Sequence, residues 1–461
     1  MMNLSPILQR FVDKARLPVM MRALLQRELD AVQLDRWFES VAQQQYTRKL
    51  LFSTLFELMT QVVLRQSGSI RAAWLEAEGD VGVSLASVYN KLNGLEPTTS
   101  AALVSFAAKR SHELIDAMPG ARRDLLAGLP VRVLDGNCLD GRQHRLQVTR
   151  ESSAAPLPGK ALVVFDPQRE TIEAMVPCED GHAQERALLG QVGPLVDAGQ
   201  VWVADRNFCT EAFLSELDDR GAYSLIREHG NLRFAQLDAI REPVRIEGAD
   251  CFVGEQQVQL KARADGREGL VLRRIKVTLD VPTRHDETEL YLLSTVPEHV
   301  ADAATLARLY RQRWTIERAF LHLTVQLRCE VDTLSYPSAA LFALACAMVV
   351  FNVLAVVKAA LHAAHGAEIQ EKLSSHAMAT HMRSMAQSLD DIVEPEDWQV
   401  FNALSASVMA QWLLEQAANV PLKRYAKAPA RKNPPKPAVK RKHDPKKPHV
   451  SLAKLLAKGA P

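Results

Sequence analysis

The residues best suited to chemistry lie in the octapeptide YRQRWTIE, Tyr310 to Glu317, within a pattern that predicts a helix over residues 302–330. At 100° per residue, such a helix presents one stripe within about 40° of the Glu317 direction. The stripe consists of Tyr310, Arg313, Glu317, Thr324 and Arg328. A carboxylate among cations and aromatic rings suits a metal ion and a phosphate. A solvated helix with an Arg313–Glu317 ion pair at i,i+4 spacing explains the octapeptide equally well.

Two further acids come directly after apolar runs that predict buried strands. Asp135 follows VRVL (131–134), and Asp205 follows VWVA (201–204). An amphipathic stretch over 185–199 predicts a helix between them, so the order of elements indicates an α/β sheet, in which ligands bind at the carboxyl ends of strands. Three carboxylates could hold two Mg²⁺ ions about 4 Å apart, one activating an attacking water or hydroxyl and the other stabilising the leaving oxygen. Because acids at strand ends are common, the pattern alone leaves this site a hypothesis.

The charge is divided unevenly along the 461 residues. Residues 421–461 hold 13 Lys or Arg and one acid, whereas the other 420 residues carry 43 basic and 53 acidic side chains. The tail is rich in Lys and Pro and poor in apolar residues, so we expect a disordered polycation that could hold DNA electrostatically, or simply a solubilising terminus. The acidic body needs local basic patches to bind nucleic acid.

The remaining composition points to a soluble cytoplasmic protein. Six cysteines show neither CxxC pairs nor zinc-like spacing, which favours reduced thiols, and no signal peptide is visible. The apolar run 339–357 is long enough to span a membrane, but Tyr336 and Pro337 mark an ordinary helix start, so we expect a buried core helix and no membrane partner.

The first 125 residues read as helical. Within them, Ser84 is a plausible N-cap of a short helix that leaves Ser87, Asn90 and Lys91 outward. This could be the second helix of a helix-turn-helix unit that reads DNA, or an ordinary αα-hairpin. Residues 233–296 are β-rich, with a hairpin pattern around Asp265 and Gly266.

Taken together, the chain resembles the DDE transposases of bacterial insertion sequences, in the subgroup with the signature Y-x2-R-x3-E-x6-K. The resemblance covers residues 130–360 and is carried by LDGN, ADRNF, LYLLST and YRQRWTIE, in this order. It implies a ribonuclease-H-like catalytic core interrupted by a β-rich insertion, with an N-terminal helical domain. The expected divisions are 1–125 for binding DNA ends, 126–230 and 298–420 for the core and C-terminal helices, 231–297 for the insertion, and 421–461 for the tail.

The resemblance also assigns roles to single residues. It implies that Asp135, Asp205 and Glu317 coordinate two Mg²⁺ ions, for which Mn²⁺ can substitute. Arg313 and Tyr310 are expected to contact backbone phosphate, although core packing is an alternative for Tyr310. Tyr291 in LYLLST stands where relatives stack an aromatic ring on a flipped base, although simple packing in the strand explains it equally well.

One departure concerns the signature lysine. Position 324 is Thr, and no Lys lies between Lys276 and Lys358. A Thr hydroxyl can bond a phosphate oxygen but brings no charge. Arg318 or Arg328 could supply the missing cation.

The expected function is cut-and-paste transposition, with double-stranded DNA as transposon ends and target and with a homodimer on paired ends. The main alternative is a non-catalytic derivative or inhibitor that binds the ends without cutting, which Thr324 favours. A structure-specific nuclease on the same fold is a further alternative.

Overall fold

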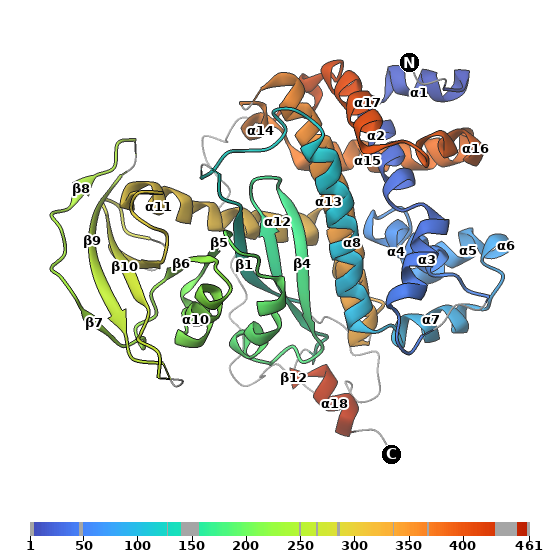
Figure 1. The fold of residues 1–461 in the computed structure, drawn as a ribbon. Helices are drawn as coiled ribbons and strands as arrows, with labels where there is room; N and C mark the ends of the chain where they lie inside the picture. The colour runs from blue at the N-terminus through green and yellow to red at the C-terminus, as the bar shows by residue number, and fades with distance from the viewer. Residues whose placement is uncertain are drawn as a thin grey trace.

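A computed structural model describes residues 4–45, 49–126, 128–139, 156–248, 250–263, 266–283, 286–334, 336–366, 368–428 and 450–458. Its centre is a ten-stranded mixed sheet, with helices packed on both faces and against one edge (Figure 1). The expected α/β class is therefore confirmed.

One half of the sheet carries the strands that end in acids. Its order is β4-β3-β1-β5-β6, in which β1, β3 and β4 are successively antiparallel and β5 and β6 run parallel to β1. These strands are β1 (Val131–Cys138), β3 (Lys160–Asp166), β4 (Thr171–Cys178), β5 (Val201–Ala204) and β6 (Tyr223–Arg227). This order and these directions are those of a ribonuclease-H-like sheet. The parallel β1–β5 pair brings the two acidic strand ends to the same edge.

The β-rich segment extends this sheet through a pairing between β6 and β11. Beyond β11 follow β10, β9 and β7, with β8 paired to β9. Their bounds are β7 (Phe234–Gln236), β8 (Val244–Arg245), β9 (Cys251–Leu260), β10 (Val271–Leu279) and β11 (Glu289–Ser294). The antiparallel β9–β10 pair confirms the predicted hairpin, whose Asp265 lies outside the described residues.

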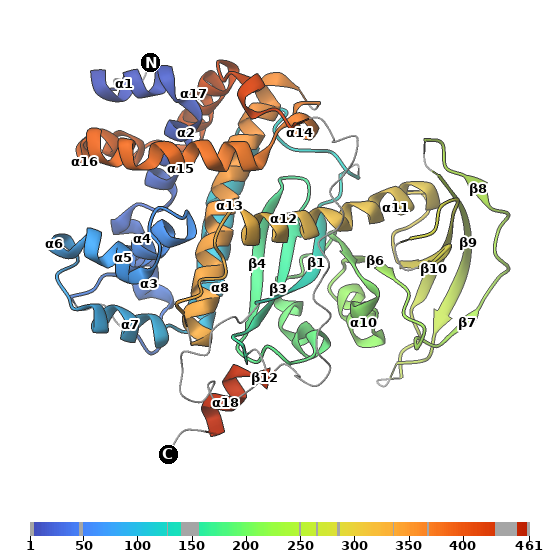
Figure 2. The same ribbon diagram turned by 180° about the vertical axis from the view of Figure 1, so that it is seen from behind.

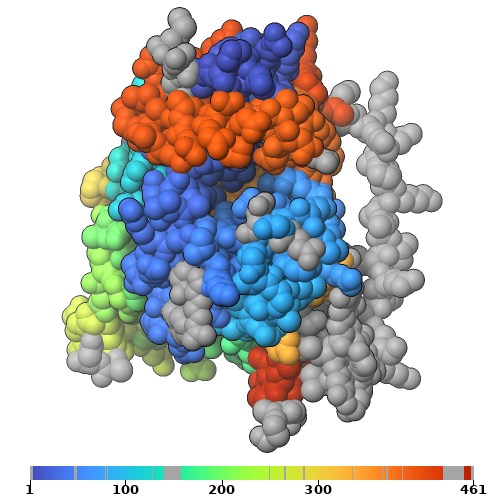
Figure 3. All heavy atoms as spheres, turned by 90° about the vertical axis from the view of Figure 1, so that its right-hand side faces the viewer, coloured from blue at the N-terminus to red at the C-terminus, as the bar shows by residue number. Residues whose placement is uncertain are grey.

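Helices from both ends of the chain cover the other edge. α8 (Pro97–Asp116) and α13 (Pro337–His365) pack against each other and against β4 (Figure 2). The N-terminal helices and the C-terminal helices form the outer face beyond α13 (Figure 3). These are α1 (Pro6–Lys14), α2 (Arg16–Glu28), α3 (Ala31–Val41), α4 (Phe52–Val63), α5 (Ile70–Glu76), α6 (Glu78–Val81) and α7 (Leu85–Asn93), and then α14 (Ile369–Lys372), α15 (Ser375–Ile392), α16 (Pro395–Trp398) and α17 (Ala406–Ala418). One continuous hydrophobic core joins all these regions to the sheet.

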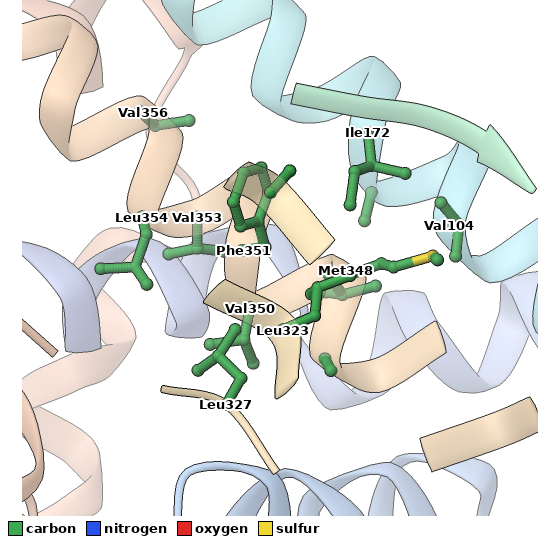
Figure 4. Packing of buried hydrophobic residues seen from close by; sticks show 14 of the residues in the cluster. Val104, Ile172, Leu323, Leu327, Met348, Val350, Phe351, Val353, Leu354 and Val356 are labelled. Atoms are coloured by element: carbon green, nitrogen blue, oxygen red, sulfur yellow. The ribbon is translucent and has the colours of Figure 1, made fainter. Parts of the chain in front are cut away.

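α13 is the centre of that core. Met348 and Phe351 lie among side chains of α8, β4 and the chain around Leu323 (Figure 4). Asn352, the polar residue in the apolar run, is buried and pairs with both backbone groups of Ile172, donating to the carbonyl and accepting from the N–H at 2.8 Å each. Among the described residues, α13 is the one helix apolar and long enough to cross a membrane, and its most apolar stretch is wholly buried inside the protein.

The structure corrects two expected elements. The helix predicted over 185–199 is instead two short 3₁₀ segments, η1 (Glu185–Gln191) and η2 (Gly193–Leu195), because Gly193 and Pro194 interrupt the helical pattern. The helix predicted over 302–330 is divided into α11 (Ala303–Tyr310), the 3₁₀ turn η4 (Arg311–Arg313) and α12 (Trp314–Val325).

The prediction of a disordered tail over 421–461 is wrong at both of its described ends. Residues Leu422–Tyr425 form the 3₁₀ turn η6 with Tyr425 buried, and β12 (Val450–Ser451) pairs with β2 (Pro156–Leu157) before α18 (Leu452–Lys458). Leu452 is buried, so this apolar residue of the tail packs against the folded protein.

In the N-terminal region, the short helix α7 has Ser84 as its N-cap, as predicted. Ser87 and Asn90 are exposed, but Lys91 is half-buried and its ammonium donates to the Leu50 carbonyl. Lys91 is therefore engaged within the protein and does not point outward. The choice between a DNA-reading helix and a plain hairpin now depends on Ser87 and Asn90.

Candidate active site

Asp135 lies at the point where β1 leaves the core. The strand is buried up to Leu134 and becomes partly exposed from Asp135 onward. Since side chains alternate across a sheet, Asp135 faces the same side as Val133, which packs in the core shared with α12 and α13. Its Oδ1 accepts a hydrogen bond from the Gly136 N–H at 2.9 Å. Burial raises the pKa of Asp135 to about 6, although the nearby Arg313 guanidinium lowers it.

Arg313 links the first and third predicted acids. Its guanidinium donates to Asp135 Oδ2 at 3.1 Å and to Glu317 Oε1 at 2.9 Å. The Arg313 side chain is only 12% exposed, whereas that of Glu317 is 44% exposed. The i,i+4 ion pair expected from the sequence therefore exists, but it also extends across to β1. The predicted ion pair is confirmed, and the active-site role of the stripe stays a prediction.

Asp205 follows β5 and begins the 3₁₀ turn η3 (Arg206–Phe208). Its charge acts on Asp135, on Arg313 and on Tyr310, which places all four groups in one neighbourhood. Tyr310 itself is 9% exposed and packs in the main core, and burial raises its pKa. This burial, in the same core cluster as Leu306 and Leu309, agrees with the core-packing alternative. The Tyr310 side chain also bonds the Arg313 side chain, and its contact with DNA stays a prediction.

A fourth carboxylate, Glu185, was not singled out from the sequence. Its Oε2 accepts from the Asn207 amide at 2.6 Å, and the neighbouring Arg186 Nε donates to the Asn207 carbonyl at 2.6 Å. A Cβ added at Gly136 would lie 2.3 Å from Glu185 Oε1, so the carboxylate occupies the space that a side chain would take. Glu185 thus holds the turn after Asp205 close to the residue after Asp135. The sequence signal was the Gly in LDGN, whose need for close approach becomes visible only with its neighbour.

The other predicted DNA-binding residues lie apart from this cluster. Arg328 follows the end of α12, donates to the Gly68 carbonyl at 2.7 Å and pairs with Asp332 at 3.3 Å. It is not on the Glu317 stripe, because the helix ends at Val325. Thr324 is exposed, and its hydroxyl donates to the Phe320 carbonyl at 3.0 Å. Arg318 is exposed and lines a cavity on another side of α12.

Tyr291 lies on β11, within the extended part of the sheet. The Arg274 guanidinium lies 3.8 Å from the centre of its ring, so one ring face is already covered. Arg274 is itself held by Glu228 through two hydrogen bonds of 2.6 and 3.2 Å. Base stacking on Tyr291 would have to use the opposite face.

The donor set around Arg313 fits a hard divalent cation, because it consists of carboxylate oxygens. Among the described residues, no three acidic, His or Cys side chains are arranged to bind an ion as they stand. Arg313 instead bonds both Asp135 and Glu317, and its single positive charge balances only one of their two negative charges. An ion could replace this guanidinium only if Arg313 gave up one carboxylate, and the exposed Glu317 is the one free to rotate.

Comparisons with known proteins give one family match. Residues 128–351 match the family described as the transposase DDE domain. A search of curated proteins gives no match. A cryo-EM structure of a piggyBac transposase synaptic complex with hairpin DNA is similar at 11% sequence identity, covering 86% of each chain with a TM-score of 0.36. The family match supports a DDE transposase domain over residues 128–351, a range that includes Asp135, Asp205 and Glu317.

Proposed function

We propose that this chain is a transposase that binds the terminal inverted repeats of its own insertion sequence and cuts and joins DNA with Mg²⁺. The observation that carries the proposal is the position of Arg313, which bonds Asp135 from 178 residues away and Glu317 from four residues away. It joins two of the three acids expected from the resemblance, and Asp205 acts on the same groups.

In this proposal Asp135, Asp205 and Glu317 hold the divalent metal. When bound, Mg²⁺ lowers the pKa of the attacking water or 3′-hydroxyl and stabilises the leaving oxygen. The burial of Asp135 keeps bulk water from screening the charges there. The Arg313 guanidinium bonds Asp135 and Glu317 with two of its five N–H groups, and a remaining terminal N–H group would contact a DNA phosphate.

The DNA-binding parts of the proposal lie outside the acidic cluster. The N-terminal helices would recognise the ends of the element, and the basic tail would hold the backbone without sequence preference. A homodimer on paired ends remains part of the proposal because the resemblance implies it.

The test uses a plasmid that carries the DNA flanking the gene on both sides. The purified full chain with Mg²⁺ should nick this plasmid at the element ends, and the Asp135→Asn variant should not. If parent and variant give the same absence of nicking while both bind the end DNA, the catalytic proposal fails.

The rival proposal is a protein that binds the ends without cutting. Thr324 favours it, because the signature lysine would add a cation near the substrate phosphate. Calorimetric titration with Mg²⁺ separates the two proposals. Heat that disappears in Glu317→Gln supports catalysis, and a parent protein that binds no Mg²⁺ supports the rival.

A further inference from the structure

A cavity of about 300 Å³ lies between α12, α13, the start of α15 and the chain at Lys427. Its walls carry three basic side chains, Arg318, Lys358 and Lys427, and one carboxylate, Glu170. Glu170 is already shared, since it pairs with Arg123 at 3.3 Å and lies 3.8 Å from Lys358 Nζ. Within the described part of the chain, Arg318 and Lys427 have no ion-pair partner. The cavity is therefore cationic, and its one acid is divided between two bases.

The charged form of Lys358 is unfavourable in this cavity. Its side chain is 16% exposed, and its ammonium forms no hydrogen bond to a described residue beyond the long contact with Glu170. Burial lowers the pKa of Lys358, and the nearby Lys427 and Arg318 lower it further. A buried ammonium among like charges is unfavourable unless an anion joins them.

Further donors converge on the same space. Ser375 and His376, the first two residues of the 18-residue helix α15, line the cavity, and helix N–H groups in the first turn have no acceptor within the helix. The Ser374 side chain caps the helix by accepting from the Ala377 N–H, which leaves the first N–H groups free of that bond. Cations combined with a helix N-terminus suit an oxygen-rich anion such as phosphate.

The cavity is distinct from the acidic cluster. α12 contributes five residues to it, and Gln326 follows the end of the helix. At 100° per residue, Thr315, Ala319 and His322 lie about 140–160° around the helix from Glu317, whereas Arg318 lies about 100° and Leu321 about 40° away. A ligand here would thus touch mainly the side and back of the helix that carries Glu317 rather than the reacting phosphorus.

We propose that this cavity is a phosphate-binding site that holds a backbone phosphate of DNA at a distance from the cutting site. The phosphate chemistry follows from the cavity alone, whereas DNA as its source rests on the proposed function. Bound phosphate would connect α12 to α13, α15 and the chain at Lys427. The site therefore fixes the back of the active-site helix when DNA is bound.

The first test is calorimetry with inorganic phosphate in EDTA, so that no metal site can contribute. Lys427→Ala and Arg318→Ala alter exposed side chains and should fold normally, which thermal unfolding verifies. Each should weaken phosphate binding about tenfold, the size of one lost charged hydrogen bond. The matched control is Lys423→Ala, an exposed lysine on η6 that does not line the cavity. If both cavity variants bind phosphate like the control, the site does not exist.

The second test measures binding of a 30-base-pair duplex in EDTA over a range of salt concentrations. For a phosphate contact, Arg318→Ala and Lys427→Ala should each reduce the slope of log affinity against log salt by about one, and Lys261→Ala, at an exposed lysine outside the basic tail and the cavity, should not. A variant that loses phosphate binding but keeps the parent slope overturns DNA as the source. Neither measurement depends on cleavage, so failure of the catalytic proposal would be seen separately.

Discussion

On one face of α12, Arg313 lies between Asp135 and Glu317 at hydrogen-bond distance, but with Asp205 nearby this single cation faces three carboxylates. On another side of α12, the cavity walls carry Arg318, Lys358 and Lys427 but one carboxylate, Glu170, which lies between Lys358 and Arg123. The acidic cluster therefore lacks positive charge, which a divalent metal ion would supply, and the cavity lacks an anion. One helix can therefore position a metal ion on one side and a phosphate on another, and the helix itself keeps the two ligands apart.

The largest expected effect is loss of cutting in Asp135→Asn. The substitution removes an acid that Arg313 binds but leaves a side chain of the same size, so the fold should persist. Cleavage of the plasmid should fall at least about a thousandfold, in the range seen for loss of a principal catalytic group. Lys261→Ala, at an exposed lysine with no proposed role, provides the control. Retention of more than a tenth of the parent rate would contradict the assignment.

Gly136→Ala should give the next largest effect. The new Cβ would displace the Glu185 carboxylate, whose end is flexible, so the free energy of unfolding should change little. Asn207 would lose its partner and the turn after Asp205 would loosen, so we expect the cleavage rate to fall about 10- to 100-fold, as for a misplaced catalytic group. Rates and denaturant midpoints measured together check this.

Two variants of Glu185 distinguish its role in positioning Asn207 from the effect of its charge. Glu185→Gln retains an oxygen that can accept from Asn207 and should keep most activity, whereas Glu185→Ala should resemble Gly136→Ala. Equal losses in both variants would mean that the charge of Glu185, rather than its hold on Asn207, is what matters.

The cationic face makes a prediction about pH. Burial, with Lys358 and Arg318 nearby, lowers the pKa of His322 to about 4, while Glu170 and a hydrogen bond to Gln326 oppose the shift. Because the folded pKa lies below the unfolded value of about 6.5, the neutral ring is favoured in the folded state. This contribution is complete above pH 6.5 and is lost as the pH falls toward 4.

Denaturant unfolding at pH 7 and pH 5 measures the contribution of His322. The parent should lose about 1–2 kcal/mol more than His322→Gln over this interval. The same loss in both proteins would show that His322 titrates normally.

The smallest effect is expected from Thr324→Lys, which restores the signature lysine on an exposed position of the acidic face. One added cation should tighten duplex binding about two- to fivefold at low salt, and the gain should shrink as salt rises. Weaker binding would show that no phosphate passes this position.

The strands that carry Asp135 and Asp205 could be predicted because each depends on a local pattern, an apolar run that ends in a carboxylate. Glu317 was predicted from a helical stripe instead. The prediction that five residues share one helix face was only partly right, because it assumed one continuous helix over residues 302–330. The 3₁₀ turn at Arg311–Arg313 and the end of α12 at Val325 changed the phase and removed Arg328. The hold of Glu185 on Asn207 and the Lys358 cavity could not be predicted, because each depends on residues brought together by the tertiary fold.

The most direct test of the central claim is Mn²⁺ binding followed by electron paramagnetic resonance on the full chain. We expect the parent to bind Mn²⁺ and each of Asp135→Asn, Asp205→Asn and Glu317→Gln to lose most of that binding. Lys427→Ala, on the cationic face, should bind Mn²⁺ like the parent. Parent-like Mn²⁺ binding in all three acid variants would contradict a shared metal site.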